Sequence, residues 1–562
     1  MNKKLTKAYL DLHEIGSLSN VCIVGIDSEY ELDLIHERIC DENNVIVFHP
    51  SSINPYSNHR IFKRSRTAYT YNCESHDVLE QLAHCGEYDV GLGNFVVIYS
   101  EYVTRKNPEW VSTLSSAMNE AHSARRTALL TEILLAIPGV YNRTVNLAKY
   151  IASPGVNSFV NAYKGIPGIV VAAGPSLSKN KELSRQVKGK AVTCGVIPIV
   201  EPLAKDGIEL DYATIIDYHT ISEVFTKNIP RDCGTTLIVD SKAAHGAVSK
   251  FPGPKVFNDD PYTHMYVGMA VPKRNTFPNG STVAHSAFAF LKLCGCDPII
   301  FVGQDLSWSK DGETHYPETS SRCRWNGKKK GWTDFDRNQW DKQSETSNFE
   351  INDIYGNLVT TDAKLLSYKT EFEKLINESD IEVINATEGG VGMTGAKEME
   401  LSEVIEKYIQ KPYSKLDYKA LKGRGNTKEA RKNIDMVLVG IKERERDINK
   451  ALGMYKSLFM AIRQGDMQKS RESVNQIQTF FKTVDAITPI TKLTNKRAVA
   501  GRARAEKKAR SRLADELRDG RNANNELRWE MIEATRDVEF LESLKKAGKH
   551  IETELRAARQ KI

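Results

Sequence analysis

The chain has 562 residues, of which 40% are hydrophobic and 27% are charged, close to the composition of ordinary soluble globular proteins. This composition excludes wholesale disorder, and the length predicts roughly three or four domains at about 100–200 residues each. The nine cysteines are scattered and form no CxxC pair. We therefore expect free thiols in a reducing compartment rather than disulfides or a zinc site.

The net charge of +6 is concentrated at the C-terminal end of the sequence. Residues 496–562 hold 18 Lys and Arg against 12 Asp and Glu, so the preceding 495 residues carry no net charge. The first residues are basic but lack the apolar stretch of a secretory signal, and no run of about 18 apolar residues occurs anywhere. We expect a cytoplasmic protein without a membrane partner.

Residues 1–107 alternate strand-like and helical patterns, which predicts a small N-terminal α/β domain. No GxGxxG sequence follows the first apolar run, so a dinucleotide site is not supported there. Residues 108–154 carry apolar positions at helical spacing and are predicted to form a helical bridge. The expected elements are strands at 21–25, 45–48 and 95–99, and a helix at 30–39.

Residues 155–410 alternate buried strand-like runs with helix-length segments, which favours a mostly parallel sheet covered on both faces. The fold class predicted for this central domain is therefore a Rossmann-like α/β fold. The expected elements are strands at 167–173, 191–194, 212–216, 236–239, 299–302 and 382–385, and a helix at 281–293.

Residues 411–562 are rich in charge and poor in strand signals, which predicts an all-helical C-terminal domain. An apolar stripe with coiled-coil-like spacing runs from Leu527 to Leu541 and then slips in phase, so an oligomer formed through these helices is one expectation. Gly520 and Gly548 are expected to interrupt the stripe.

In an open parallel sheet, ligands bind in the loops that follow the carboxyl ends of the strands. The first such loop offers Gly174, Pro175 and Ser176, where glycine permits close backbone approach and free amides at a helix start would favour phosphate, although a tight turn explains the same residues. Asp217 could bind a ribose or a cation, or it could cap the next helix. Both an anion and simple capping would suit Ser281 and Thr282.

The loop after 299–302 is the most specific, because it packs Gly303, Gln304, Asp305, Thr314 and His315 closely behind an apolar strand. A histidine can transfer protons near neutral pH, and Asp305 could orient it or bind a hydroxyl. After the last strand, a glycine pair lies beside two further polar candidates, Asn385 and Glu388. The adjacent acids Asp259 and Asp260 are expected to form a solvated turn rather than a metal site.

Four blocks in this order are characteristic in combination: AAGPSLSKN, DYATIIDYH, GSTVAHSAFAFLKLCGCDPIIFVGQDLSWSKDGETHY and NATEGGVGMTG. Together they resemble the motility accessory factor (Maf) family, flagellin glycosyltransferases that share the domain of 6-hydroxymethylpterin diphosphokinase-like proteins. The resemblance covers the central domain of about 250 residues and, more loosely, the three-part layout. It implies a sialyltransferase-like core. Trp308, Tyr316 and the segment 322–340 depart from the family pattern.

The resemblance implies transfer of a CMP-activated nonulosonic acid, pseudaminic or legionaminic, to Ser or Thr hydroxyls of flagellin, for flagellum assembly and motility. No cofactor and no metal would be required. Asp305 and His315 would flank the sugar and the incoming hydroxyl, with His315 as the base. The implied nucleotide-sugar-binding residues are Gly174, Pro175, Ser176, Asp217, Ser281, Thr282, Gly303, Gln304, Thr314, Asn385 and Glu388.

Two alternatives remain open from the sequence. The same core could transfer pyrophosphate from ATP with Mg²⁺, held by Asp217, Asp305 and Glu388. The protein could also be a non-catalytic, flagellin-binding assembly factor. The basic stretch 496–512 has no aromatic residues. A solvated helical face or contact with an acidic protein surface is therefore favoured there over nucleic acid.

Overall fold

The structure is a computed structural model that describes residues 15, 19–39, 43–71, 78, 95–182, 185–308, 323–326, 331–334, 348–484, 489–518 and 523–562. Two compact units make up the chain: Met1–Ile137 with Ile441–His550, and Pro138–Gly440 with Ile551–Ile562. Each unit is described by itself below. The predicted domain limits at 107, 154 and 410 stay a prediction.

The first unit contains a four-stranded parallel sheet in the order β3-β2-β1-β4. Both faces of β1 are buried, because Cys22 and Val24 join one apolar core while Val21 and Ile23 join another. The N-terminal part of helix α6 (Pro108–Val145) covers the first face of the sheet, and α2 (Glu29–His36) covers the second face. The strands are β1 (Asn20–Val24), β2 (Asn44–Phe48), β3 (Thr67–Thr70) and β4 (Phe95–Tyr99), and α5 (Glu101–Lys106) follows β4.

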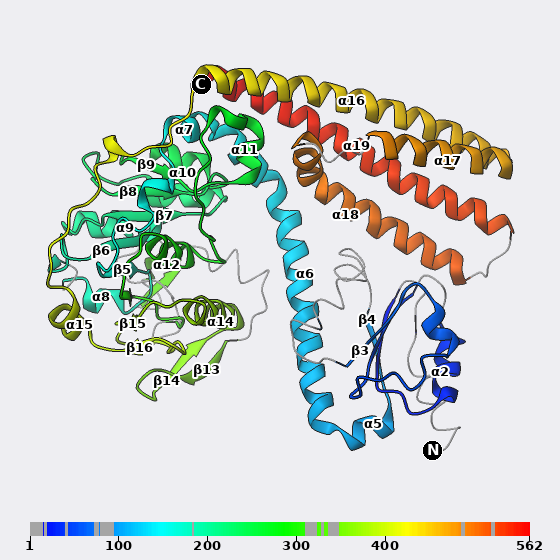
Figure 1. The fold of residues 1–562 in the computed structure, drawn as a ribbon, viewed down its shortest axis with the longest axis horizontal. Helices are drawn as coiled ribbons and strands as arrows, with labels where there is room; N and C mark the ends of the chain where they lie inside the picture. The colour runs from blue at the N-terminus through cyan, green and yellow to red at the C-terminus, as the bar shows by residue number, and fades with distance from the viewer. Residues whose placement is uncertain are drawn as a thin grey trace. The chain divides into compact units, whose positions relative to one another are not determined.

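The second unit is built on an eight-stranded parallel sheet in the order β16-β15-β10-β5-β6-β7-β8-β9, which confirms the predicted α/β class (Figure 1). From β5 the chain steps outward to β9, then returns to the other side of β5 as β10. The carboxyl ends of β5 and β10 therefore form the topological switch point, where such sheets bind ligands. The strands are β5 (Gly168–Val171), β6 (Val192–Val196), β7 (Tyr212–Ile215), β8 (Thr236–Val239), β9 (Lys255–Phe257), β10 (Ile299–Val302), β15 (Val383–Asn385) and β16 (Lys397–Glu398).

Helices and one hairpin complete the second unit. Helix α12 (Val283–Leu293) buries every residue from Ala284 to Leu291 and packs on β5, β6, β7 and β10. A hairpin that the sequence pattern did not indicate joins β13 (Phe349–Asn352) to β14 (Leu358–Thr361). The other elements are α7 (Leu147–Ala152), α8 (Leu177–Asn180), α9 (Ile197–Lys205), α10 (His245–Lys250), α11 (Pro261–Val267), α14 (Ala363–Asn377) and α15 (Leu401–Tyr408), with the separate strands β11 (Cys323–Asn326) and β12 (Gly331–Asp334) paired to each other.

The C-terminal region is helical, as predicted: α16 (Thr427–Arg463), α17 (Met467–Val484), α18 (Pro489–Arg518) and α19 (Ala523–Lys561). The expected interruption at Gly548 is wrong, because α19 continues through it (Figure 1). A Cβ built on Gly548 would lie 3.6 Å from Ile441 Cγ2, an ordinary contact, so the glycine is not a break. Gly520 lies outside the described residues. None of the described helices is both long and apolar enough to span a membrane.

Candidate functional site

The loops after β5, β10 and β15 meet at the switch point through the side chain of Asp305. Its carboxylate accepts hydrogen bonds from the backbone N–H of Ser176 (3.1 Å to Oδ1, 3.3 Å to Oδ2) and from Ser176 Oγ (2.7 Å). Both residues are buried. A Cβ built on Gly389 would lie 3.9 Å from Ser176 Cβ and 4.0 Å from Asp305 Oδ1, so the third loop is also in contact. The predicted residues Ser176 and Asp305 are thus brought together.

The glycines of these loops make room for Asp305. A Cβ at Gly174 would lie 1.9 Å from Asp305 Oδ2 and 2.5 Å from the Gly303 carbonyl oxygen. Gly390 has φ +71°, and a Cβ there would lie 2.1 Å from the Asp305 carbonyl oxygen. We predicted that glycine here lets backbone approach a ligand. The close approach is instead to the protein's own carboxylate and main chain.

Replacing Gly174 with alanine is therefore expected to destabilise the second unit by about 2–4 kcal/mol, because the new methyl group overlaps atoms that cannot move without opening the loop. Urea unfolding followed by far-UV circular dichroism measures the effect. As a matched control, Gly453→Ala places its methyl group in open space within α16 and should leave stability equal or slightly higher. A loss below about 0.5 kcal/mol for Gly174→Ala would contradict the packing argument.

Burial raises the pKa of Asp305 to about 6, although the hydrogen bonds from Ser176 and the charge of Lys179 act in the opposite direction. The ammonium group of Lys179 donates to the Glu388 carbonyl oxygen (3.4 Å), and its charge acts on the Asp305 carboxylate. The sequence analysis missed Lys179. Its signal was available, because Lys179 stands three residues after Ser176 at the start of the predicted helix.

The free amides predicted at this loop are not free. Gly174 N–H donates to the Gly303 carbonyl oxygen (2.7 Å), Ser176 N–H donates to Asp305, and Leu177 N–H donates to the Gly174 carbonyl oxygen (3.1 Å). The amide-based argument for a phosphate cradle at Gly174, Pro175 and Ser176 is therefore wrong. A cationic side chain such as Lys179 is the better candidate partner for an anion here.

The remaining predicted residues of this group mostly bind other protein groups. Asn385 Nδ2 donates to Glu398 Oε1 (2.9 Å), and Gln304 N–H donates to the hydroxyl oxygen of Thr387 (3.1 Å). The carboxylate of Glu388 accepts from the Leu401 N–H (2.9 Å) and so caps helix α15. Within the described part of the chain, the buried Oε1 of Gln304 has no hydrogen-bond partner.

The other predicted residues belong to a second group of loops. The carbonyl oxygen of Asp217 accepts from Ala244 N–H (2.8 Å), and its carboxylate accepts from His219 N–H (3.0 Å). A capping box with His285 uses the Thr282 side chain, while Ser281 N–H donates to the Glu371 carboxylate (3.1 Å). Capping, the simpler of the two sequence interpretations, therefore describes Thr282, whereas Ser281 is held by the carboxylate of Glu371.

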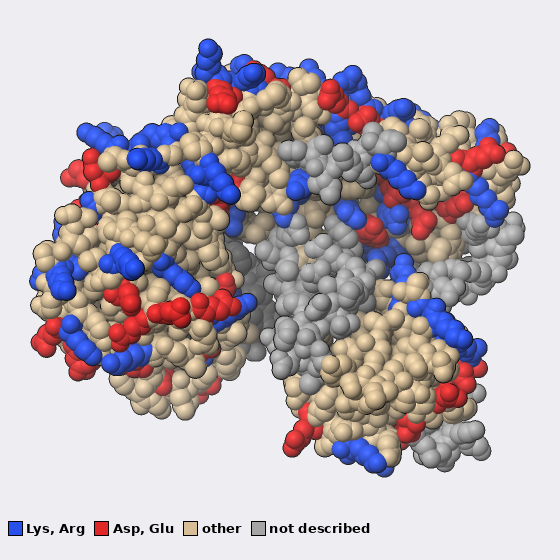
Figure 2. All heavy atoms as spheres, viewed as in Figure 1, with Lys and Arg blue, Asp and Glu red and all other residues tan. Residues whose placement is uncertain are grey.

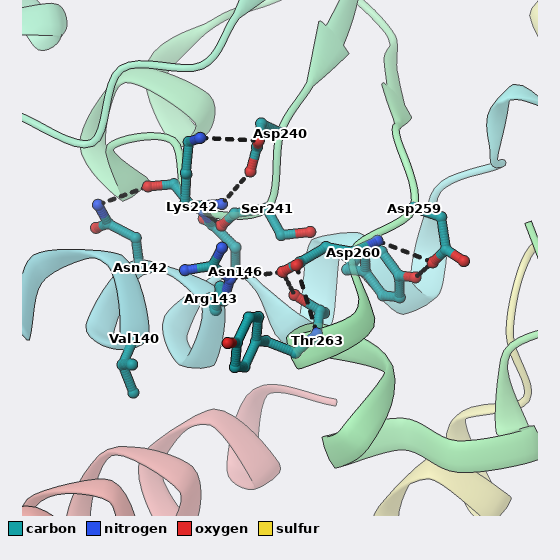
Figure 3. Close-up of polar contacts among 12 residues, drawn as sticks. Val140, Asn142, Arg143, Asn146, Asp240, Ser241, Lys242, Asp259, Asp260 and Thr263 are labelled. Atoms are coloured by element: carbon teal, nitrogen blue, oxygen red, sulfur yellow. Dashed lines mark hydrogen bonds and ion pairs between the residues drawn. The ribbon is translucent and has the colours of Figure 1, made fainter. Parts of the chain in front are cut away.

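Two asparagines, Asn142 in α6 and Asn146 at the N-cap of α7, join the loops of this second group (Figure 3). Asn142 Nδ2 donates to the carbonyl oxygens of Tyr218 (3.0 Å) and Lys242 (2.9 Å). One turn later, Asn146 Nδ2 donates to the carbonyl oxygens of Ser241 (3.1 Å) and Ala243 (2.9 Å). The end of α6 thus binds the loops after β7 and β8. An i, i+4 pair of asparagines within a helical segment was the sequence signal.

Between these asparagines, Arg143 Nε donates to Asp260 Oδ2 (2.5 Å), with side-chain exposures of only 14% and 11% (Figure 3). Asp260 also caps α11 and accepts from Thr263 Oγ1 (2.6 Å). Its neighbour Asp259 accepts from the Tyr150 hydroxyl (2.6 Å). The solvated turn predicted for Asp259 and Asp260 is therefore wrong. A helix cap and a buried ion pair occupy that position.

The predicted base, His315, and Thr314 lie outside the described residues, so their roles stay predictions. The structure does not bring together the three carboxylates required by the Mg²⁺ alternative, those of Asp217, Asp305 and Glu388. Among the described residues, no three His, Cys, Asp or Glu side chains are placed to hold a metal ion.

Comparison with known proteins bears on the second unit and on the whole fold. Residues 141–311 match the family described as MptE-like, 6-hydroxymethylpterin diphosphokinase MptE-like. The solved structure of the Maf glycosyltransferase from Magnetospirillum magneticum AMB-1 is similar with a TM-score of 0.59 at 13% identity, covering 99% of this chain and 84% of that chain. No curated protein matches the sequence. Residues 141–311 are therefore similar to the MptE-like family, and the chain has, along nearly its whole length, the fold of that Maf glycosyltransferase.

Proposed function

We propose that this protein is a cytoplasmic glycosyltransferase that transfers pseudaminic or legionaminic acid from a CMP-sugar to Ser or Thr hydroxyls of flagellin. The observation that carries the proposal is the buried Asp305–Ser176 pair at the switch point, inside the segment matched by the MptE-like family. Support for a sugar-transfer reaction comes from the fold shared with a protein named a Maf glycosyltransferase. The donor and acceptor identities rest on the four sequence blocks quoted above.

Local groups must recognise the anionic donor, because the chain before residue 496 has no net charge. On the face shown in Figure 2, basic and acidic side chains are interspersed over the second unit. Lys179 donates to the Glu388 carbonyl oxygen in the loop after β15, and its charge lowers the pKa of Asp305. We therefore propose that the ammonium group of Lys179 binds the phosphate of the CMP leaving group.

In the proposed reaction, the bond between the anomeric carbon and the phosphate oxygen breaks as the acceptor hydroxyl oxygen bonds to that carbon. Charge stabilisation of the departing CMP is the main demand, and it needs no cofactor in this scheme. The hydroxyl proton passes to a base, for which His315 remains the sequence-based candidate. Burial raises the pKa of Asp305 to about 6, so its carboxylate is largely ionised at neutral pH, and we assign to it the stabilisation of positive charge that develops on the sugar.

The match of residues 141–311 to a 6-hydroxymethylpterin diphosphokinase MptE-like family favours one second candidate, a diphosphokinase that transfers pyrophosphate from ATP. Such an enzyme would need Mg²⁺. The three carboxylates expected to hold the ion are not gathered among the described residues.

Thermal shift assays with CMP, CTP, ATP, and ATP with Mg²⁺ distinguish the two candidates. We expect CMP without metal to raise the unfolding temperature, because a ligand at 100 times its Kd stabilises the folded state by about 2.7 kcal/mol. Lys179→Met should abolish most of that shift, whereas Lys190→Met, which removes an exposed lysine of the same unit, should not. Stabilisation by ATP only with Mg²⁺ would favour the diphosphokinase. No response to any nucleotide would favour the non-catalytic assembly factor.

A further inference from the structure

A cleft of about 740 Å³ lies among the helices of the first unit. Its volume is within the range of pockets that bind small molecules, about 300–1,000 Å³, and helical bundles commonly build such sites between their helices. The residues matched by the MptE-like family lie elsewhere, in the second unit. The lining residues come from α16, α17, α18 and α19.

The floor of the cleft is apolar and aromatic. Tyr455, Ile477, Leu541 and Leu544 are buried and belong to the apolar core of the helices, and Phe481 and Phe540 pack against that core. Ile477 and Phe481 are four residues apart on α17, and Leu541 and Leu544 are three apart on α19, so each of these two helices turns an apolar stripe toward the cleft. An apolar body would find a complementary surface there.

The lining also carries more positive than negative charge: four cationic side chains face two carboxylates. Both carboxylates are already engaged. Asp537 accepts from the Tyr455 hydroxyl (2.9 Å) and from Arg536 Nε (2.9 Å), and Glu506 lies 3.8 Å from Arg536 Nε. The charge excess therefore favours an anion, and it accounts for part of the basic stretch that the proposed function leaves unexplained.

Close packing of α18 against α19 lies beside the cleft. A Cβ on Gly501 would lie 2.2 Å from Ser543 Oγ, so the two helices are in tight contact at that level. One turn along, Ala505 offers a small side chain, and the Arg502 guanidinium lies over the Phe540 ring at 5.4 Å from its centroid. A cation is thus held directly above an aromatic wall, an arrangement that suits a ligand with an anionic head and an apolar body.

We propose that this cleft is a second ligand site, which binds an amphiphilic organic anion: an aromatic or aliphatic body that carries a carboxylate, sulfonate or phosphate. The apolar stripes of α17 and α19 hold the body, and Arg502 with Lys482 holds the head. The site is independent of the sugar-transfer reaction, so the failure of either proposal leaves the other standing.

The probe is 8-anilino-1-naphthalenesulfonate, titrated by fluorescence into the full-length folded protein and compared with its uncharged analogue N-phenyl-1-naphthylamine. We expect saturable binding of one sulfonate per chain, about tenfold tighter than binding of the uncharged analogue, a difference of about 1.4 kcal/mol. Decanoate should displace the probe. Equal affinity for the two probes would overturn the proposal, as would displacement by polyglutamate but not by decanoate, which would indicate an acidic protein surface as the partner.

Two variants locate the binding. Arg502→Glu and Lys482→Glu should each weaken sulfonate binding about tenfold and leave binding of the uncharged analogue within about twofold. The matched control is Arg504→Glu, two residues from Arg502 on the same helix, exposed and outside the cleft lining. Circular dichroism melting confirms that each variant is folded. A loss of equal size in Arg504→Glu would show that only the general charge of α18 matters and would overturn the assignment.

Discussion

Replacing Asp305 with asparagine is expected to lower sugar transfer by about 10²–10³-fold while the protein stays folded. Asparagine has nearly the same shape, its Oδ1 can still accept from Ser176 N–H, and its amide can donate to Ser176 Oγ. The substitution therefore removes the negative charge and little else. Release of CMP from the CMP-sugar in the presence of flagellin measures the effect. Asp232→Asn, at an exposed carboxylate of the same unit, should retain full activity.

The pH dependence separates a role in the reaction from a merely structural one. Burial raises the pKa of Asp305 from an ordinary 3.8 to about 6, so activity that needs the carboxylate should rise with pH through about 6 and then level off. A raised pKa adds stability below about pH 4, and this stability is lost as the pH rises through 6. At pH 7 to 8, Asp305→Asn should therefore unfold at an equal or higher temperature than the wild type.

A purely structural Asp305 would behave differently, because asparagine would then lower activity and unfolding temperature together. Unchanged activity in Asp305→Asn, or persistence of the rise near pH 6 in that variant, would contradict the proposed role.

Most of the strands that could be predicted are fully buried; β4, which was also predicted, is half-buried. Val21–Val24, Val45–Phe48 and Ile299–Val302 are continuous runs of β-branched and aromatic residues, the pattern of a parallel sheet covered on both faces. The missed strands are short or half-buried: β3 is only partly covered, β9 has three residues and β16 has two exposed ones. Such strands form because a neighbouring strand offers hydrogen bonds. That neighbour can be far away in the sequence, so the local residue pattern does not reveal the pairing.

The meeting of two candidate loops was predictable, but their internal contacts were not. The rule that ligands follow the carboxyl ends of parallel strands selected the loops of Ser176 and Asp305, and the structure brings these two residues together. However, the two residues are 129 positions apart, so the sequence could not reveal that the Asp305 carboxylate accepts a hydrogen bond from the N–H of Ser176. The same holds for Asp260, which looks like a surface turn until Arg143, 117 positions earlier, lies beside it.

Replacing Arg143 with methionine is expected to lower the stability of the second unit by about 3–5 kcal/mol, because it leaves the buried Asp260 carboxylate without a counter-ion. Methionine keeps most of the apolar stem of arginine, so the loss reports the charge rather than a cavity. Hydrogen exchange at the amides of Asn146 and of α11 measures the opening free energy locally. This local readout is needed because a protein with two units need not unfold in one step.

A double variant tests the cause. Asp260→Asn keeps an oxygen that can cap α11 and accept from Thr263, so Arg143→Met with Asp260→Asn leaves no uncompensated charge and should recover most of the loss. Arg185→Met serves as the control, since its partner Glu182 is 65% exposed and such surface pairs contribute only about 0–1 kcal/mol. If Arg143→Met costs no more than Arg185→Met, the ion pair does not fix the end of α6, and Asn142 and Asn146 alone must hold the loops after β7 and β8.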